Sequence, residues 1–156
     1  MTEHATSGGA ASAATSGDRD STPLAVISEH PLDAEAIESA VTTEHDGAVV
    51  IFRGVVRDHD HGVAVTGLDY QAHPDAVEFL QQSCARIAAE TGLRVAAAQR
   101  VGSLEVGEVA LIAAVAAPHR SAAFDAIERL VDDIKLTVPI WKRQHVADGT
   151  TEWVGL

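Results

Sequence analysis

The sequence contains few of the residues on which several common classes of protein depend. A single cysteine cannot form a disulfide within the chain, which fits a reducing cytoplasm. Eleven lysine and arginine residues stand against 23 aspartate and glutamate residues, so the formal net charge is -12. This composition argues against a nucleic-acid partner, because phosphate binding needs a broad basic face. The longest apolar run, residues 109–117, is far shorter than the roughly 20 residues that cross a bilayer.

The first 22 residues are mostly alanine, serine, threonine and glycine and lack bulky apolar side chains. We expect them to form a disordered tail, since such a composition cannot bury a core. They also lack the basic start and apolar stretch of a secretory signal. Residues 23–156 are expected to form one domain with enough apolar content for a core.

The remaining chain shows both strand-like and helix-like patterns. Asp33 is placed to cap a helix, Pro74 to start one and Gly92 to end one. Strands and helices alternate only partly, and hairpin-like links are present, so we predict an α+β fold. The expected strands are 24–28, 47–56, 63–72, 94–101 and 108–117, and the expected helices are 34–43, 74–91 and 119–135, with a polar loop at 57–62 and a link at 102–107.

Lys135 and Lys142 are the only lysines in the chain, and they lie within one segment, residues 135–143. Pro139 forbids helix at the residue before it and fixes an extended approach to the residues after it. We therefore expect a helix to end at Lys135 and Lys142 to fold back beside it, which would create an anion site. The alternative is that Lys135 complements a helix dipole and that Lys142 and Arg143 form a solvated rim.

His119 and Arg120 lie where an apolar strand pattern gives way to a helical one. Free backbone N–H groups and the helix dipole at such a junction favour an anion. The two ends of this helix would be roughly 20 Å apart at about 1.5 Å per residue. Either the segment containing Lys142 returns to the helix start, or a second subunit completes the site. The apolar residues of the helix follow at spacings of three, four and three: Phe124, Ile127, Val131 and Ile134.

Four separated segments, taken together, resemble one known family. They are residues 47–57, the stretch that begins His119-Arg120, Lys135, and residues 138–143. Their order and spacing are similar to those of the large catalytic subunit of molybdopterin synthase, and the resemblance covers about residues 24–154.

The resemblance implies an α/β hammerhead-type fold, with a mixed or antiparallel sheet and flanking helices, that forms a homodimer. It also implies a partner, a small ubiquitin-like sulfur carrier with a C-terminal Gly-Gly thiocarboxylate, at each end of the dimer in a heterotetramer. Sulfur would pass twice to cyclic pyranopterin monophosphate, which gives the dithiolene of molybdopterin. No cofactor is expected, and the single thiol, Cys84, would not supply the sulfur.

The same resemblance implies roles for individual residues. Lys135 would be the main catalytic lysine, stabilising negative charge or shuttling protons, and Lys142 would assist it and hold the substrate. The remaining pocket residues would bind the substrate: His119, Arg120, Arg57, Arg143 and Gln144. Gln144 stands where the family often has a glutamate, and the chain lacks the charged tail of many relatives.

Other readings of single residues remain open. The pair His59 and His61 suggests a metal, but it lacks a third fixed ligand, so no metal site is predicted. Arg57 could instead form a salt bridge at a strand end. Ser121 is expected to cap a helix rather than act as a nucleophile. Two further residues are expected to be structural: Cys84 in the core of the second helix, whose apolar face also includes Val77, Leu80, Ile87 and Ala88, and Trp141 as an aromatic anchor for Lys142.

Two other functions are compatible with the lysines. The first is an enzyme that forms a Schiff base between Lys135 or Lys142 and a carbonyl substrate. The second is a non-catalytic module that binds an acidic peptide tail or a phosphorylated ligand. Neither requires the joint presence of four separated segments.

Overall fold

The computed structural model describes residues 22–155, so most of the predicted tail, residues 1–21, lies outside the described part. Within these described residues the order of elements is mixed, with three helices placed among nine strands. The strands are β1 (Leu24–Ser28), β2 (Ala48–Val55), β3 (His59–Asp60), β4 (Val63–Ala72), β5 (Arg94–Arg100), β6 (Gly102–Glu105), β7 (Val109–Ala117), β8 (Ile140–Val146) and β9 (Thr151–Gly155). The helices are α1 (Ala34–Val41), α2 (Ala76–Thr91) and α3 (Arg120–Thr137).

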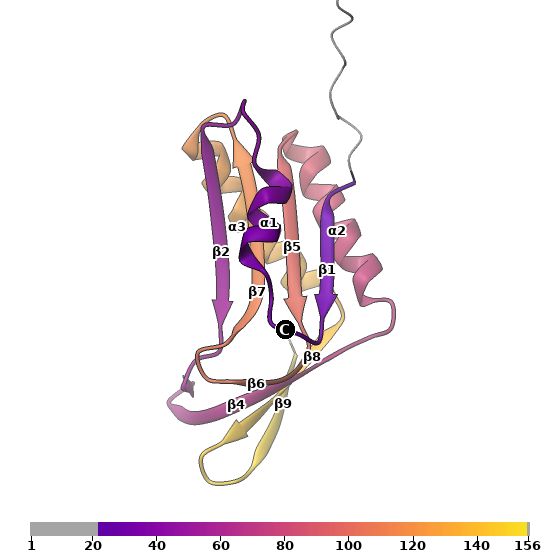
Figure 1. The fold of residues 1–156 in the computed structure, drawn as a ribbon. Helices are drawn as coiled ribbons and strands as arrows, with labels where there is room; N and C mark the ends of the chain where they lie inside the picture. The colour runs from indigo at the N-terminus through magenta and orange to yellow at the C-terminus, as the bar shows by residue number, and fades with distance from the viewer. Residues whose placement is uncertain (1–21, 156) are drawn as a thin grey trace, which may run out of the picture.

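The first sheet has the strand order β1-β5-β7-β2. β1 runs parallel to β5, and the other neighbours are antiparallel. Helix α1 covers one face of this sheet and helices α2 and α3 cover the other, as Figure 1 shows. The central strands β5 and β7 are therefore buried on both sides, which explains their nearly continuous apolar sequence.

The second sheet lies beyond the lower end of the first in Figure 1 and is built around β4. β8 pairs with β4 and β9 pairs with β8, while β3 and β6 pair with other parts of β4. Its small core is formed by Val56, Val65, Leu68, Leu104 and Ala110. The two sheets and three helices confirm the predicted α+β class.

Most element boundaries follow from local signals in the sequence. The Asp33 carboxylate accepts a hydrogen bond from the Ala36 amide and caps α1. Gly92 ends α2 in the left-handed conformation. Val138 is extended before Pro139, so α3 ends at Thr137, two residues later than predicted.

Four expectations about secondary structure need correction. The predicted polar loop 57–62 contains the two-residue strand β3, and the predicted link 102–107 contains β6. Both are too short to show a periodic pattern. Helix α2 begins at Ala76 with Asp75 as its first flanking residue, rather than at Pro74. Helix α1 ends at Val41, two residues before the predicted end.

Three apolar residues are more exposed than expected: two from the apolar faces of helices, and Trp141, which was expected to anchor Lys142. Phe124 is 59% exposed and Val77 is 37% exposed, although they share the spacing of the buried residues on their helices. Both lie near helix starts, at the border of the face that packs on the sheet. Trp141 is 46% exposed and does not anchor Lys142, because neighbouring residues of a strand point to opposite faces.

No helix among residues 22–155 is long and apolar enough to cross a membrane.

Candidate functional site

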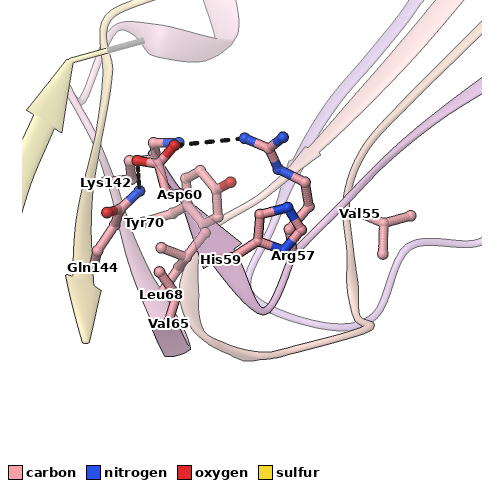
Figure 2. A pocket seen from close by; sticks show the side chains of 9 residues that line it. All are labelled: Val55, Arg57, His59, Asp60, Val65, Leu68, Tyr70, Lys142 and Gln144. Atoms are coloured by element: carbon pink, nitrogen blue, oxygen red, sulfur yellow. Dashed lines mark hydrogen bonds and ion pairs between the residues drawn. The ribbon is translucent and has the colours of Figure 1, made fainter. Parts of the chain in front are cut away.

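The second sheet carries a small pocket lined mainly by polar side chains, shown in Figure 2. Lys142 and Gln144 come from β8, and Arg57 follows the end of β2. Strand alternation explains the first pair, since residues two apart on a strand share a face. The rest of the lining comes from β2, β3 and β4: Val55, His59, Asp60, Val65, Leu68 and Tyr70.

A hydrogen-bonded carboxylate connects the two sides of the pocket. The Gln144 side-chain amide donates to Asp60 Oδ2 at 2.7 Å, and Arg57 donates to Asp60 Oδ1 at 3.5 Å. Both contacts are drawn in Figure 2. The Gln144 hydrogen bond, followed by the charges of His61, Lys142 and Arg57, holds the pKa of Asp60 below its usual value. Asp60 is thus an ionised group among donors.

The pocket wall beside this carboxylate is more enclosed. Gln144 is only 4% exposed, and its amide therefore has a fixed orientation. Burial raises the pKa of the Tyr70 hydroxyl, so this group stays neutral and can donate a hydrogen bond. Lys142 is paired with Tyr70 in the register of β4 and β8. The pocket therefore combines two cations, a neutral donor and one carboxylate.

Arg143 does not line this pocket, contrary to the sequence-based expectation. It follows Lys142 on β8 and so points to the opposite face of the sheet. There its guanidinium donates to Asp69 Oδ2 at 2.8 Å and lies over Trp153, 5.2 Å from the ring centroid. Asp69 also accepts from Ser103 and is bonded to His145. The Ser103 and Arg143 hydrogen bonds lower the pKa of Asp69 to about 2.

The other three predicted site residues do not line the pocket. Lys135 is exposed near the end of α3, and His119 and Arg120 are exposed at its start. Helix α3 has 18 residues, so its ends are about 27 Å apart at 1.5 Å per residue. In Figure 1, β8 lies at the end of the molecule where α3 finishes. The chain thus brings Arg57, Lys142 and Gln144 together but leaves His119 and Arg120 at a distance.

Three other sequence-based readings can be compared with the structure. Cys84 is fully buried in the core, as predicted, and burial together with the Asp133 charge raises the pKa of its thiol to about 12. Ser121 is not a helix cap, since His119 occupies that position without a side-chain cap bond. No metal-binding group of three His, Cys, Asp or Glu side chains occurs within residues 22–155. His59 instead contacts Asp58.

The sequence reading missed Asp60 and Tyr70 as pocket residues. Asp60 lies in a stretch that was interpreted as a loop, and its role depends on a hairpin that brings it to β8. Tyr70 alternates with Asp69 on β4, so a strand-alternation argument could have placed it on the same face as Leu68. The partner of each depends on sheet register, which the sequence alone did not define.

Comparisons with known proteins give a consistent result. A family model described as MoaE protein matches residues 27–137. The chain is 39% identical over 135 residues to "Molybdopterin synthase catalytic subunit 1" of Mycobacterium tuberculosis, covering 85% of this chain and 91% of that protein. It is 38% identical to "Molybdopterin synthase catalytic subunit" of Bacillus subtilis, covering 83% of both chains.

Solved structures show the same fold. A crystal structure of molybdopterin synthase from Staphylococcus aureus superposes with a TM-score of 0.78 at 33% identity, covering 85% of this chain and 97% of that one. A structure from Helicobacter pylori, described as a complex of subunits 1 and 2 of molybdopterin-converting factor, has a TM-score of 0.66 at 20% identity. It covers 84% of this chain and 89% of that one and bears on the fold alone.

Proposed function

Since this chain belongs to the MoaE protein family, we propose that it is the catalytic subunit of a molybdopterin synthase and transfers sulfur to a pterin. Its role in molybdenum cofactor biosynthesis follows from its relatives, which are molybdopterin synthase catalytic subunits. The substrate is cyclic pyranopterin monophosphate, and the product carries the dithiolene of molybdopterin. We place the reaction in the cytoplasm.

The observation that carries this proposal is the grouping of Arg57, Lys142 and Gln144 in one pocket. The sequence analysis predicts all three as pocket residues from their types and positions. Arginine and lysine bind anions differently, since arginine offers a planar fork and lysine a compact charge. Together they suit a site that must hold phosphate or thiocarboxylate oxygens and also stabilise negative charge that develops during transfer.

The pocket supports a site that one chain does not complete. Its volume is about 60 Å³, far below the roughly 300–1,000 Å³ of pockets that enclose a small ligand. His119 and Arg120 are too far along α3 to reach it within the same chain. We therefore propose that a second copy of the chain contributes His119 and Arg120, which bind the substrate phosphate, in a homodimer with two-fold symmetry.

The sulfur arrives on a partner protein in this proposal. The only thiol of the chain, Cys84, is buried and has a raised pKa, so it is a poor nucleophile. The proposed donor is a small ubiquitin-like carrier that ends in a Gly-Gly thiocarboxylate. One carrier at each end of the dimer makes a heterotetramer. The solved H. pylori complex of subunits 1 and 2 shares this fold.

Lys135 and Lys142 have different roles in this proposal. Lys142 is half-buried in the pocket and is proposed to hold the substrate and stabilise charge. Lys135 is exposed on α3 and is proposed to reach the reacting atoms from the other side once the carrier tail is seated. Its side chain has a long, flexible stem, and no ion pair holds it among the described residues. Arg143 supports β8 from its opposite face instead of touching the substrate.

The test is reconstitution with purified components. The protein is mixed with thiocarboxylated carrier and cyclic pyranopterin monophosphate, and dithiolene pterin is assayed as its oxidised fluorescent derivative. Wild-type protein should give product, and Lys135→Ala should give almost none while retaining its fold and carrier binding. Near-wild-type turnover by Lys135→Ala would remove this lysine from the mechanism. Product formation without the protein would overturn the proposed function.

A further inference from the structure

The pocket contains a carboxylate where an anion site should contain none. Asp60 is the only acidic residue that lines it, and its side chain is 18% exposed. It accepts hydrogen bonds from Gln144 and Arg57, which are two of the groups proposed to receive the substrate's anionic oxygens. The positive charge of Lys142 also acts on it. An incoming anion would therefore meet a fixed negative charge that already accepts from the Gln144 amide and lies beside the two cations.

Asp60 is held in this position by a small hairpin. β3 pairs with the start of β4, and the loop between them consists of His61 and Gly62. Both loop residues have positive φ, 48° and 80°, as in the tight two-residue turns that join antiparallel strands. Only His59 and Asp60 pair with β4 from this strand, and His61 and Gly62 are exposed. One further backbone hydrogen bond, from the Val65 amide to the Asp58 carbonyl at 2.8 Å, ties the hairpin to β4, so displacement of Asp60 need disturb only this short element.

We propose that Asp60 is a specificity-determining residue, a tethered carboxylate that occupies the anion site in the free chain and must be displaced by the ligand. The inference rests on the proposed function, in which this pocket receives an anionic group. The ligand it selects is the carboxylate-type end of an extended peptide tail. The rest of such a tail adds contacts that help displace Asp60, whereas a lone small anion brings only its charge.

The proposed role of Asp60 predicts the direction in which its removal changes the affinity for an anion. Two carboxylates in one pocket repel each other, so Asp60 weakens the binding of any anion that does not displace it. Once displaced, Asp60 moves toward solvent, where its charge is hydrated. Replacement of Asp60 by a neutral residue should therefore strengthen anion binding. If Asp60 instead positioned Arg57 and Gln144 for the ligand, the same replacement would weaken binding.

The test compares three proteins: wild type, Asp60→Asn and Asp58→Asn. Asp58 is the matched control, because it loses the same charge two residues away but does not line the pocket, and its exposed side chain contacts His59. The probe is N-acetyl-glycylglycine with a free carboxylate, and its C-terminal amide is the neutral control. Binding is followed by NMR through the side-chain amide signal of Gln144, because this amide donates its hydrogen bond to Asp60.

The expected result is a dissociation constant about tenfold lower for Asp60→Asn than for wild type, from the loss of a like charge at short range. Asp58→Asn should stay within about twofold of wild type, because its charge is exposed and screened. The amide probe should show no such difference. Asp60→Ser should reproduce the effect and guards against a folding defect in the first variant.

Equal or weaker binding of the free carboxylate by Asp60→Asn would overturn the inference, as would binding too weak to detect in all three proteins. A failure of the proposed function is distinguishable. In that case the reconstituted reaction gives no product, while the ratio of dissociation constants between wild type and Asp60→Asn still shows whether Asp60 competes with the ligand.

Discussion

The two sheets of this protein are built from the same kinds of element but serve different purposes. In the first sheet, β5 and β7 are buried on both faces by helices, and their side chains are mostly alanine and valine. In the second sheet, β4 and β8 place polar groups on both faces: Lys142 and Gln144 on one, Arg143 and His145 on the other. The first sheet supplies stability, and the second carries the proposed chemistry.

A second contrast lies within the second sheet, between two aspartates on β3 and β4. Asp69 accepts hydrogen bonds from Ser103 and Arg143 and is bonded to His145 at 2.7–2.8 Å. Asp60 has one short hydrogen bond from Gln144 and a longer one, at 3.5 Å, from Arg57. The saturated carboxylate fixes three strands, whereas the less satisfied one faces the pocket. Stability and function are thus separated between the faces of one sheet.

In the comparison of the two sheets, the largest expected effect comes from removing the pocket lysine of the second sheet. Lys142→Ala should reduce dithiolene formation by at least about 100-fold, since charge stabilisation or proton transfer by a positioned side chain contributes that much or more. Its melting temperature should remain close to wild type, because Lys142 makes no ion pair in residues 22–155. If the variant loses stability along with activity, Lys142 also stabilises the fold, and the proposed division between a stabilising first sheet and a functional second sheet fails.

In the first sheet, a core substitution is expected to lower stability without changing activity. Ile112 is 1% exposed at the centre of β7. Ile112→Ala should lower the free energy of unfolding by about 2–5 kcal/mol through lost burial and a cavity. Turnover per folded molecule should be unchanged at a temperature where the variant is folded. Denaturant unfolding and reconstituted turnover on the same sample would check both statements.

An intermediate effect is expected at Asp69. Its pKa is lowered from 3.8 to about 2 in the folded protein, so the ionised form stabilises the fold. This stability is present above about pH 4 and is lost as the pH falls towards 2, and it amounts to about 2 kcal/mol. Asp69→Asn should lack this contribution. The difference in unfolding free energy between the two proteins should be constant from pH 7 to about pH 5 and shrink below it.

A pH-independent difference between wild type and Asp69→Asn would contradict this account of the opposite face. Arg143→Gln offers a related check, because it removes one donor to Asp69 without touching the pocket. Its effect should be on stability first. A loss of turnover with unchanged stability would return Arg143 to the pocket, where the sequence analysis had placed it.

The smallest effect is expected at the only thiol. Cys84→Ala should change turnover by less than about twofold, because a core residue away from the site acts only through packing. The native protein should also resist thiol reagents, since the raised pKa and complete burial keep Cys84 protonated and inaccessible. Loss of sulfur transfer in Cys84→Ala would mean that the sulfur passes through this chain.

The sequence predicted the longer elements well because their patterns extend over several turns or repeats. The span of β4 and the end of α2 agree with the prediction, and Pro139 correctly marked the break after α3. No strand was predicted at β9. The shortest strands, β3 and β6, were missed because two to four residues carry no period. They form only because β4 offers an edge for them.

Within the candidate site, residue type was easier to predict than contact. Arg57, Lys142 and Gln144 meet in the pocket as expected, but Arg143 does not, since adjacent strand residues face opposite ways. Asp60 was missed because its position depends on a hairpin and on the register between β4 and β8. In the proposed dimer, the placement of His119 and Arg120 relative to the pocket depends on a second chain, and the order of residues in one chain carries no signal for that contact.

The most direct test of the central claim, a site shared between two copies, is complementation between two inactive variants. His119→Ala and Lys142→Ala proteins would be purified, mixed under conditions that exchange subunits, and assayed for dithiolene pterin with carrier and substrate. If each site takes Lys142 from one copy and His119 from the other, mixed dimers regain one intact site, and the mixture should recover about a quarter of wild-type activity. If subunits exchange but no activity returns, both residues act within one chain and the shared site is contradicted; a His119→Ala protein that is active before mixing would contradict it as well.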